Sequence, residues 1–217
     1  MRCGPGARRG PSARCGLKHE RTLYKTGVET IAGIDEAGRG PLAGPVVAAA
    51  VILPPRFRHK TLTDSKQLSP GKREAIYGEL TGTPEIAWAV RAVETEEIDR
   101  LNILRATHEA MRLAVAALRI APQHVLIDGR PVLPFPFPQT AVIDGDQQSF
   151  SIAAASVIAK VTRDRIMIEM DSQYPGYEFG RHKGYSTPLH RNRLQAHGPC
   201  PIHRRSFWPV ALALLAS

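Results

Sequence analysis

Two adjacent acids, Asp35 and Glu36, follow an apolar run and sit beside a glycine-rich turn in the sequence GIDEAGRG, residues 33–40. Two unit charges about 4 Å apart repel by about 4 kcal/mol at an effective dielectric constant of 20, so acids at the end of a buried strand call for a compensating cation. The pair therefore suggests a metal site. Taken alone, it is more simply explained as a solvated turn with two ordinary acids.

The same layout occurs twice more along the chain. VLIDG, residues 125–129, and AVIDGD, residues 141–146, are short apolar runs that end in Asp and Gly. Such runs are typical of buried strands, and sites in open α/β sheets collect outside the carboxyl ends of strands, so the acids should converge. Their oxygens suit Mg²⁺ or Mn²⁺ better than zinc. The candidate ligands are Asp35, Glu36, Asp128 and Asp146.

Phosphoryl transfer is the natural chemistry of such a site. In two-metal sites one ion activates the attacking water and the other stabilises the leaving oxygen, so the protein mainly supplies carboxylates in fixed positions. A dinucleotide-binding loop is the competing interpretation, because glycines follow a strand. However, Gly38, Gly40 and Gly44 do not have the G-x-G-x-x-G spacing, and the preceding acids would repel a pyrophosphate.

The elements that must position these acids form a mixed sheet. The first strand ends near Asp35, residues 45–53 return antiparallel to it, and residues 86–93 offer a third strand. A short helix can begin at Ser69 and Pro70. After the third strand, one longer helix is predicted from Thr95, with a buried stripe at helical spacing that contains Ile98, Leu101, Leu104, His108, Met111, Val115 and Leu118.

A helical crossover places the Asp128 strand parallel to the first strand, which brings Asp35 and Asp128 to adjacent strand ends. Residues 131–138, PVLPFPFP, are predicted to be a connecting loop, because prolines remove ladder donors. Ser149 or Ser151 can then cap a further helix. The predicted fold is a mixed α/β sheet flanked by helices.

The motifs together resemble the bacterial ribonuclease HII family. After GIDEAGRG come PLAGPVVAAAVIL, DSK, IDG, GDQQS, AAASVIAKVTRDR and HKGY in the family's order and spacing, starting at Pro41, Asp64, Ile127, Gly145, Ala153 and His182. The resemblance spans nearly everything after about residue 28 and implies a ribonuclease H-like fold for the mixed sheet and its flanking helices. The related ribonuclease HIII carries glycine-threonine-glycine where this chain has Gly38-Arg39-Gly40, which favours HII.

The resemblance implies an endonuclease that hydrolyses the phosphodiester 5′ of a ribonucleotide embedded in duplex DNA and degrades the RNA strand of an RNA:DNA hybrid. Metals held by the four acids, Mn²⁺ or Mg²⁺ in a two-metal site, would activate water for in-line attack and leave 3′-hydroxyl and 5′-phosphate ends. We expect a monomer. An inactive nucleic-acid-binding module is the alternative, but a binding surface gains nothing from acids that face phosphates unless metals are bound.

The resemblance also implies substrate contacts. The turn Gly38-Arg39-Gly40 would read a ribose 2′-hydroxyl at an RNA to DNA junction, the group that distinguishes RNA from DNA. Tyr185 resembles the family's tyrosine that packs against the sugar of the neighbouring deoxynucleotide. Lys66 and Lys183 are expected phosphate contacts. Two further cations are expected on a helix surface or in internal ion pairs, namely Arg163 and Arg165.

The formal net charge of +9 points to an anionic partner. Residues 1–28 hold seven Lys or Arg against Glu20 alone, which is +6, so only +3 remains for the rest of the chain. We predict that this leader is disordered, because it lacks apolar periodicity, and that it is a dispensable tail or a nucleic-acid tether. Residues 29–173 would form the catalytic domain and residues 174–217 a small C-terminal helical subdomain.

The chain contains no run of roughly 18 apolar residues and no hydrophobic signal region, so we expect a cytoplasmic enzyme that does not bind membranes. The cysteines, Cys3, Cys15 and Cys200, are too few and too far apart for a disulfide framework or a zinc motif. The C-terminal histidines match no helix-face ligand pattern, so structural or surface roles are expected for His182, His190, His197 and His203.

Overall fold

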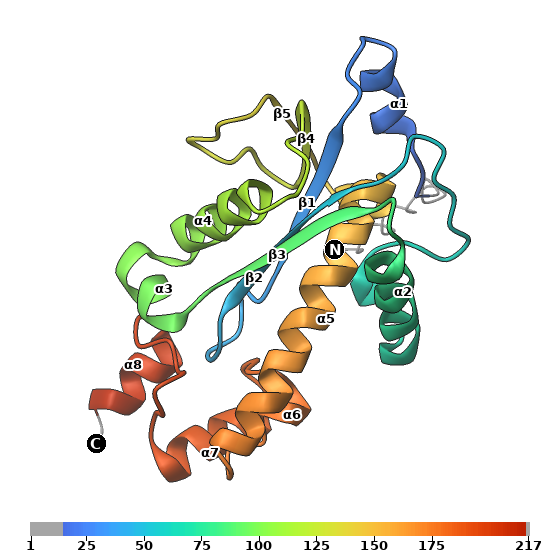
Figure 1. Ribbon diagram of the computed structural model, residues 1–217. Coiled ribbons are helices and arrows are strands. Elements are labelled where there is room, and N and C mark those ends of the chain that lie inside the picture. The colour runs from blue at the N-terminus through green and yellow to red at the C-terminus, as the bar shows by residue number, and fades with distance from the viewer. Residues whose placement is uncertain (1–14, 216–217) are drawn as a thin grey trace, which may run out of the picture.

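Five short runs of mainly β-branched and small residues form one mixed sheet in the computed structural model, which describes residues 15–215 (Figure 1). The order across the sheet is β3-β2-β1-β4-β5. β1 pairs antiparallel with β2 and parallel with β4, as predicted from the crossover. The strands are β1 (Ile31–Ala37), β2 (Val46–Ile52), β3 (Ala87–Val93), β4 (His124–Asp128) and β5 (Gln139–Val142).

The register of the two central strands decides where the acids meet. Ile34 of β1 pairs with Ile127 of β4, so the next residue of each strand is an acid, Asp35 and Asp128. Because the strands are parallel, both acids emerge at the same edge of the sheet. β5 ends at Val142, two residues before the predicted end, and the chain turns there into a short 3₁₀ helix, η2 (Gly145–Gln147).

Helices cover both faces of the sheet (Figure 1). α4 (Ile103–Ala116) packs on one face, and α5 (Phe150–Gln173) with α2 (Pro70–Gly82) packs on the other. α5 lies directly against β1, because a Cβ at Gly33 would lie 2.1 Å from the main-chain carbon of Ser151. Successive residues of β1 therefore face different helical layers.

The predicted single helix after Thr95 is wrong, because the chain forms two helices, α3 (Thr95–Leu101) and α4. Asn102 separates them in the left-handed region with φ 71°, and its side chain accepts hydrogen bonds from the amides of Leu104 and Arg105. With ψ 160°, this conformation is strained for any residue other than glycine, but asparagine is a favoured helix cap. The break rotates the predicted stripe, so that Leu104 is half-exposed and His108 is only partly buried.

The predicted caps of α2 and α5 are confirmed. Ser69 accepts a hydrogen bond from the Lys72 amide, with Pro70 at the first helical position. Of the two candidate caps for α5, Ser149 is the one that accepts from the Ile152 amide.

The prediction of a disordered leader is wrong for residues 15–28, while residues 1–14 lie outside the described residues. α1 (Lys18–Tyr24) carries Glu20, which is fully buried. Glu20 Oε1 accepts from the hydroxyls of Ser149 and Ser151 at 2.6 and 2.7 Å and from the Ser151 amide at 3.1 Å. An anionic group at a helix N-terminus is stabilised by the helix dipole, so this acid fixes α1 to the start of α5.

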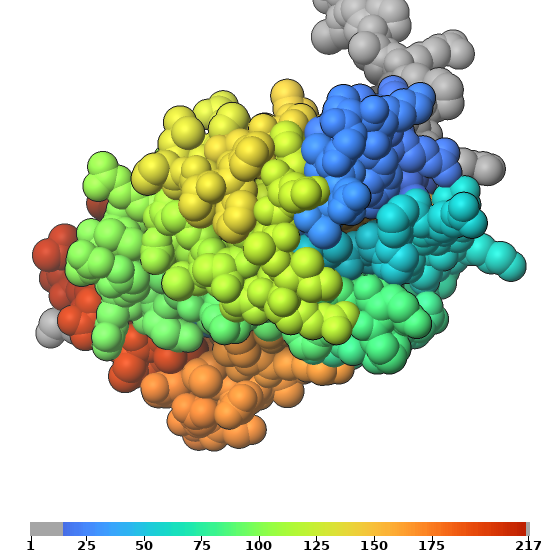
Figure 2. All heavy atoms as spheres, turned by 45° about the horizontal axis from the view of Figure 1, so that its top comes forward, coloured from blue at the N-terminus to red at the C-terminus, as the bar shows by residue number. Residues whose placement is uncertain are grey.

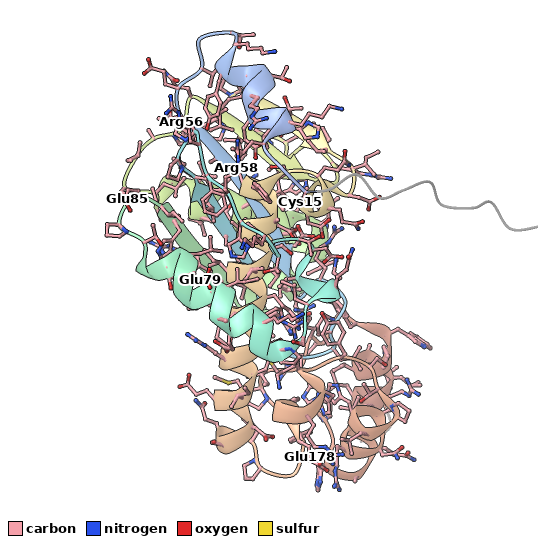
Figure 3. All side chains as sticks on the ribbon, turned by 90° about the vertical axis from the view of Figure 1, so that its right-hand side faces the viewer. Cys15, Arg56, Arg58, Glu79, Glu85 and Glu178 are labelled. Atoms are coloured by element: carbon pink, nitrogen blue, oxygen red, sulfur yellow. The ribbon has the colours of Figure 1, made fainter. Side chains whose placement is uncertain are left out.

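Three short helices follow α5: the first packs against α5, the second packs against the first, and the third packs against the second. These C-terminal residues (orange and red) lie together along one side of the molecule (Figure 2). Figure 3 shows Glu178 in this part and Cys15 toward the opposite end of α5. Glu178 pairs with Arg181 and Arg193. The three helices are α6 (Phe179–His182), α7 (Pro188–His197) and α8 (Trp208–Leu215).

No helix among the described residues is long and apolar enough to cross a membrane.

Three of the four C-terminal histidines form a buried neutral network, which confirms their structural role. The rings of His182 and His190 stack at 4.3 Å, and His190 Nε2 lies 3.1 Å from His203 Nε2. The Cys200 amide donates to His203 Nδ1, so His203 donates from Nε2 to His190. Burial, with neighbouring histidines, lowers the pKa of both His190 and His203 to about 4.

Candidate active site

Three of the four predicted acids converge at the sheet edge. Asp35, Asp128 and Asp146 each offer a carboxylate oxygen, and these oxygens all lie within 4.8 Å of one another. Asp35 and Asp128 come from the adjacent ends of β1 and β4, and Asp146 comes from η2. Asp35 and Asp146 are 5% and 4% exposed, so the cluster is open to solvent mainly at Asp128.

Main-chain amides hold two of these carboxylates in place. Asp128 Oδ1 accepts from the Gly145 amide at 2.7 Å, which ties the end of β4 to η2. Asp35 Oδ1 accepts from the Glu36 amide at 2.7 Å. Gly145 has no room for a side chain, since a Cβ there would lie 2.6 Å from Ile152 Cδ1 and 3.3 Å from Asp128 Oδ1. The local main chain therefore fixes the direction of each carboxylate.

The electrostatics of the cluster are unfavourable without a cation. Burial, followed by the charges of Glu36 and Asp128, raises the pKa of Asp35 well above its ordinary value. Burial and the Asp128 charge raise the pKa of Asp146 to about 7. Burial also raises the pKa of Asp128, against the opposing effect of the amide bonds from Gly145 and Asp146. A divalent cation would relieve this repulsion, and three hard oxygen donors match the ligand preference of Mg²⁺ or Mn²⁺.

Glu36 lies on the other side of the strand from the cluster. Adjacent strand residues point to opposite faces, so Glu36 faces α4 while Asp35 faces α5. Its Oε1 accepts from Arg39 Nη1 at 3.2 Å. Burial raises the pKa of Glu36, although Arg39 acts to lower it. Glu36 and Asp128 nevertheless line one cavity of about 410 Å³, together with Arg39 and His108.

Lys66 and Asp64 complete the charged surroundings. Although burial lowers it, the carboxylates of Asp35, Asp64, Asp146 and Asp128 raise the pKa of Lys66 above its ordinary value. Asp64 is 6% exposed and caps η1 (Ser65–Gln67) by accepting from the Lys66 amide at 2.8 Å. The sequence predicts Lys66 only as a phosphate contact and does not identify Asp64, whose carboxylate lies beside Asp146. Its place in the DSK motif was the available signal.

Apart from Lys66, the predicted substrate-binding residues lie on two segments that both contact Arg163. Gly38 packs on this arginine, since a Cβ at Gly38 would lie 2.1 Å from Arg163 Nε. The Tyr185 ring, whose residue is 40% exposed, has its centroid 5.7 Å from Arg163 Cζ and 5.7 Å from Lys160 Nζ. Lys183 is partly buried and lies two residues before Tyr185. Its ammonium donates to the carbonyl of Gly180 and so already has a hydrogen-bond partner within the protein.

The two helix arginines have different roles. Arg165 is exposed and pairs with Glu74 at 2.6 Å, as predicted. For Arg163 the prediction is wrong, because its side chain is fully buried and donates to three main-chain carbonyls instead of pairing with an acid. A sequence pattern identifies a cation on a helix but not the carbonyl groups that a distant loop brings to it.

Comparisons with known proteins agree with this geometry. The sequence model of the family described as ribonuclease HII matches residues 32–210. A ribonuclease HII from Geobacillus kaustophilus is 54% identical over 201 residues, which make up 93% of this chain and 76% of that protein.

Solved structures resemble the fold as well. The ribonuclease H2 from Pyrococcus horikoshii OT3 superposes with a TM-score of 0.70 at 29% identity, covering 86% of this chain and 98% of that one. Bst-RNase HIII in complex with Mn²⁺ superposes with a TM-score of 0.65 at 18% identity, covering 99% of this chain and 76% of that one. The last similarity is one of fold alone.

Proposed function

Because this chain belongs to the ribonuclease HII family, it is a metal-dependent endonuclease that hydrolyses the RNA strand of RNA:DNA hybrids, and we propose which residues carry that activity. The observation that carries the proposal is the convergence of three carboxylate oxygens within 4.8 Å at the sheet edge. Asp35, Asp128 and Asp146 are the proposed metal ligands.

Those three residues would hold Mg²⁺ or Mn²⁺ in a fixed geometry. The Gly145 and Glu36 amides orient Asp128 and Asp35 before any ligand arrives, so little reorganisation is needed. When bound, the divalent ion supplies Lewis-acid activation of the attacking water and neutralises charge that develops on the phosphate.

Glu36 is the proposed fourth ligand, at a second position. It lines the same cavity as Asp128, so an ion there would take oxygens from both residues. Arg39 now holds the Glu36 carboxylate and would have to release it. Lys66, which is exposed and surrounded by carboxylates, would contact a phosphate that enters the cluster. Lys183 would contact a phosphate further along the nucleic-acid strand once it leaves the Gly180 carbonyl.

Junction specificity comes from the turn of Gly38, Arg39 and Gly40 together with Tyr185. We propose that exposed amide N–H groups of the turn donate hydrogen bonds to the ribose 2′-hydroxyl oxygen, and that the Tyr185 ring packs on the sugar of the next deoxynucleotide. Cleavage would then fall 5′ of the ribonucleotide and leave 3′-hydroxyl and 5′-phosphate ends.

The test is cleavage of a labelled DNA duplex that contains one ribonucleotide, in Mg²⁺, Mn²⁺ or EDTA, beside an all-DNA duplex of the same sequence. A metal-dependent cut immediately 5′ of the ribonucleotide, with a 3′ end that a polymerase extends, is expected. Cutting of long hybrids alone would contradict the junction assignment. Binding without cleavage in every metal would favour an inactive binding module.

A further inference from the structure

Two arginines that the chemistry leaves unexplained, Arg163 and Arg204, are completely buried beneath the loop of residues 38–45. Arg163 comes from α5 and Arg204 from the segment before α8. Within residues 15–215 neither guanidinium is paired with a carboxylate. Burying two cations without anions is costly, so the groups that replace the anions should reveal what the arginines do.

Arg204 binds the main chain of the turn formed by Gly38, Arg39 and Gly40. Its Nη2 donates to the Gly38 carbonyl at 2.6 Å and its Nη1 donates to the Arg39 carbonyl at 3.0 Å. The other side of the guanidinium donates to the Gly44 carbonyl, from Nε at 3.0 Å and from Nη2 at 2.8 Å. One side chain thus closes both ends of the loop.

Arg163 supports the same loop from the other side and joins it to the Tyr185 segment. Its Nε and Nη2 donate to the carbonyls of Pro45 and Ala43 at 2.9 and 3.1 Å. Its Nη1 donates to the Lys183 carbonyl at 3.0 Å, two residues before the tyrosine whose ring it faces. The loop and the tyrosine therefore share one rigid support.

These hydrogen bonds determine which way the turn presents its amides. In a planar trans peptide group the N–H points opposite to the C=O. Since the carbonyls of Gly38 and Arg39 point into the protein toward Arg204, the amide N–H groups of Arg39 and Gly40 point outward. Arg39 and Gly40 are exposed, and nothing lies within 4 Å of a Cβ position at Gly40, so an oxygen of a substrate can approach closely.

We propose that Arg204 and Arg163 are positioning residues for ribonucleotide recognition: they hold the carbonyls of the turn inward, so that the Arg39 and Gly40 amides face a 2′-hydroxyl at a fixed distance from Tyr185. This inference rests on the proposed function, in which the turn reads the 2′-hydroxyl. The planar guanidinium fork reaches three carbonyls at once, which the single ammonium of a lysine cannot do.

The test measures discrimination and not affinity alone. In an Asp128→Asn parent, fluorescence anisotropy gives the Kd for a duplex with one ribonucleotide and for the identical all-DNA duplex. Adding Arg204→Lys should lower the ratio of the two affinities by about tenfold, because charge-assisted bonds to the turn are lost. Arg205→Lys is the matched control, because Arg205 is the next residue and its side chain is exposed. This change should leave the ratio of the two affinities unchanged.

The outcomes separate this inference from the proposed function. If the parent itself does not discriminate, the proposed role of the turn fails and this inference fails with it. If the parent discriminates and Arg204→Lys weakens binding to both duplexes equally, the arginine is merely structural and this inference alone is overturned. Thermal unfolding and Mn²⁺ titration calorimetry of Arg204→Lys made in the otherwise unchanged protein, with Asp128 intact, check that the fold and the acidic cluster are retained.

A measurement on the parent protein covers the case in which Arg204→Lys does not fold. The amide NMR signals of Arg39 and Gly40 should shift when the one-ribonucleotide duplex is added and should shift much less with the all-DNA duplex. Equal shifts with both duplexes would overturn the inference, because the amides would then not face the 2′-hydroxyl.

Discussion

The acidic cluster and the arginine pair, Arg163 and Arg204, each bring like charges together near the carboxyl end of β1. They differ in how well hydrogen bonds satisfy those charges. The carboxylates of Asp35 and Asp146 have raised pKa values, because burial and like charge outweigh the few donors around them. Burial and the charge of Arg163 lower the pKa of Arg204 to about 9, but its donors are met by carbonyls. The carboxylates need a cation to balance their charge, whereas the guanidinium groups already have carbonyl acceptors. The unsatisfied cluster is therefore suited to binding a metal, and the satisfied pair is suited to holding the loop in place.

The largest effect should come from the unsatisfied cluster. Asp128→Asn should lower the rate of RNA-strand cleavage by about 10³-fold or more, because it removes a charge from the metal site. Substrate binding should be largely preserved, which gel-shift titration would show. Asp144→Asn is the matched control: it lies in the segment that leads to Asp146, is exposed and has φ 50°, a conformation that Asn tolerates. Near wild-type rates in Asp128→Asn would remove this residue from the site.

The complementary substitution tests the satisfied pair. Arg163→Met should lower the free energy of unfolding by about 3 kcal/mol or more, since it leaves three buried carbonyls without donors. Arg165→Met, two residues along the same helix, should cost less than about 1 kcal/mol because its ion pair is exposed. Urea unfolding of both metal-free variants gives the comparison. Asp35→Asn, by contrast, should not destabilise the metal-free protein, and equal losses in all three would erase the distinction between the regions.

Glu20 offers an intermediate case, a buried acid that is only half satisfied. Its Oε1 accepts three hydrogen bonds, while Oε2 is buried without a partner in the described residues. Glu20→Gln should lower the free energy of unfolding by about 1–2 kcal/mol, because the charge at the start of α5 is lost. Glu29→Gln, an exposed acid in the same N-terminal part, should have no measurable effect. No change in Glu20→Gln would mean that α1 contributes little to the fold.

The dependence of stability on pH should show the cluster's need for a cation. The pKa of Asp146 is about 7 in the folded protein and near 3.8 without its surroundings, so the folded state holds the proton more tightly. Stability from this group is therefore lost as the pH rises from about 4 to 7. Mn²⁺ should raise Tm more at pH 8 than at pH 5, by about 4 °C or more, because protons no longer compete for the ligands. Asp146→Asn should reduce that difference, and a pH-independent effect of Mn²⁺ would contradict the assignment.

The histidine network should respond to pH in the opposite direction. The pKa values of His190 and His203 are about 4 in the folded protein, against an ordinary 6.5, so the unfolded chain binds protons first as the pH falls. Their stability contribution is complete above about pH 6.5 and is lost toward pH 4. NMR titration of the imidazole rings is the direct measurement. Protonation of either ring above pH 6 in the folded protein would contradict the neutral network.

The sequence by itself determined the parts that depend on local order. Short apolar runs closed by Asp predicted strands whose ends carry the acids, and the long stretch between residues 93 and 124 required a crossover that makes β1 and β4 parallel. The cap at Ser69 followed from side-chain chemistry, which for α5 left Ser149 and Ser151 as the two candidates. These predictions succeeded because alternation, capping and chain direction act over a few residues.

Only the tertiary structure decided the groupings that depend on which surfaces meet. It placed Glu36 on the opposite face from Asp35, because pleating separates neighbours that the sequence writes together. It turned part of a basic leader into a helix that is anchored by one buried acid, because Glu20 hydrogen-bonds to the start of α5, more than 120 residues away. It buried Arg163 and Arg204 beneath one loop, because carbonyls of that loop could replace anions. Main-chain acceptors are present at every residue, so no pattern of side chains could have identified the ones that those arginines use.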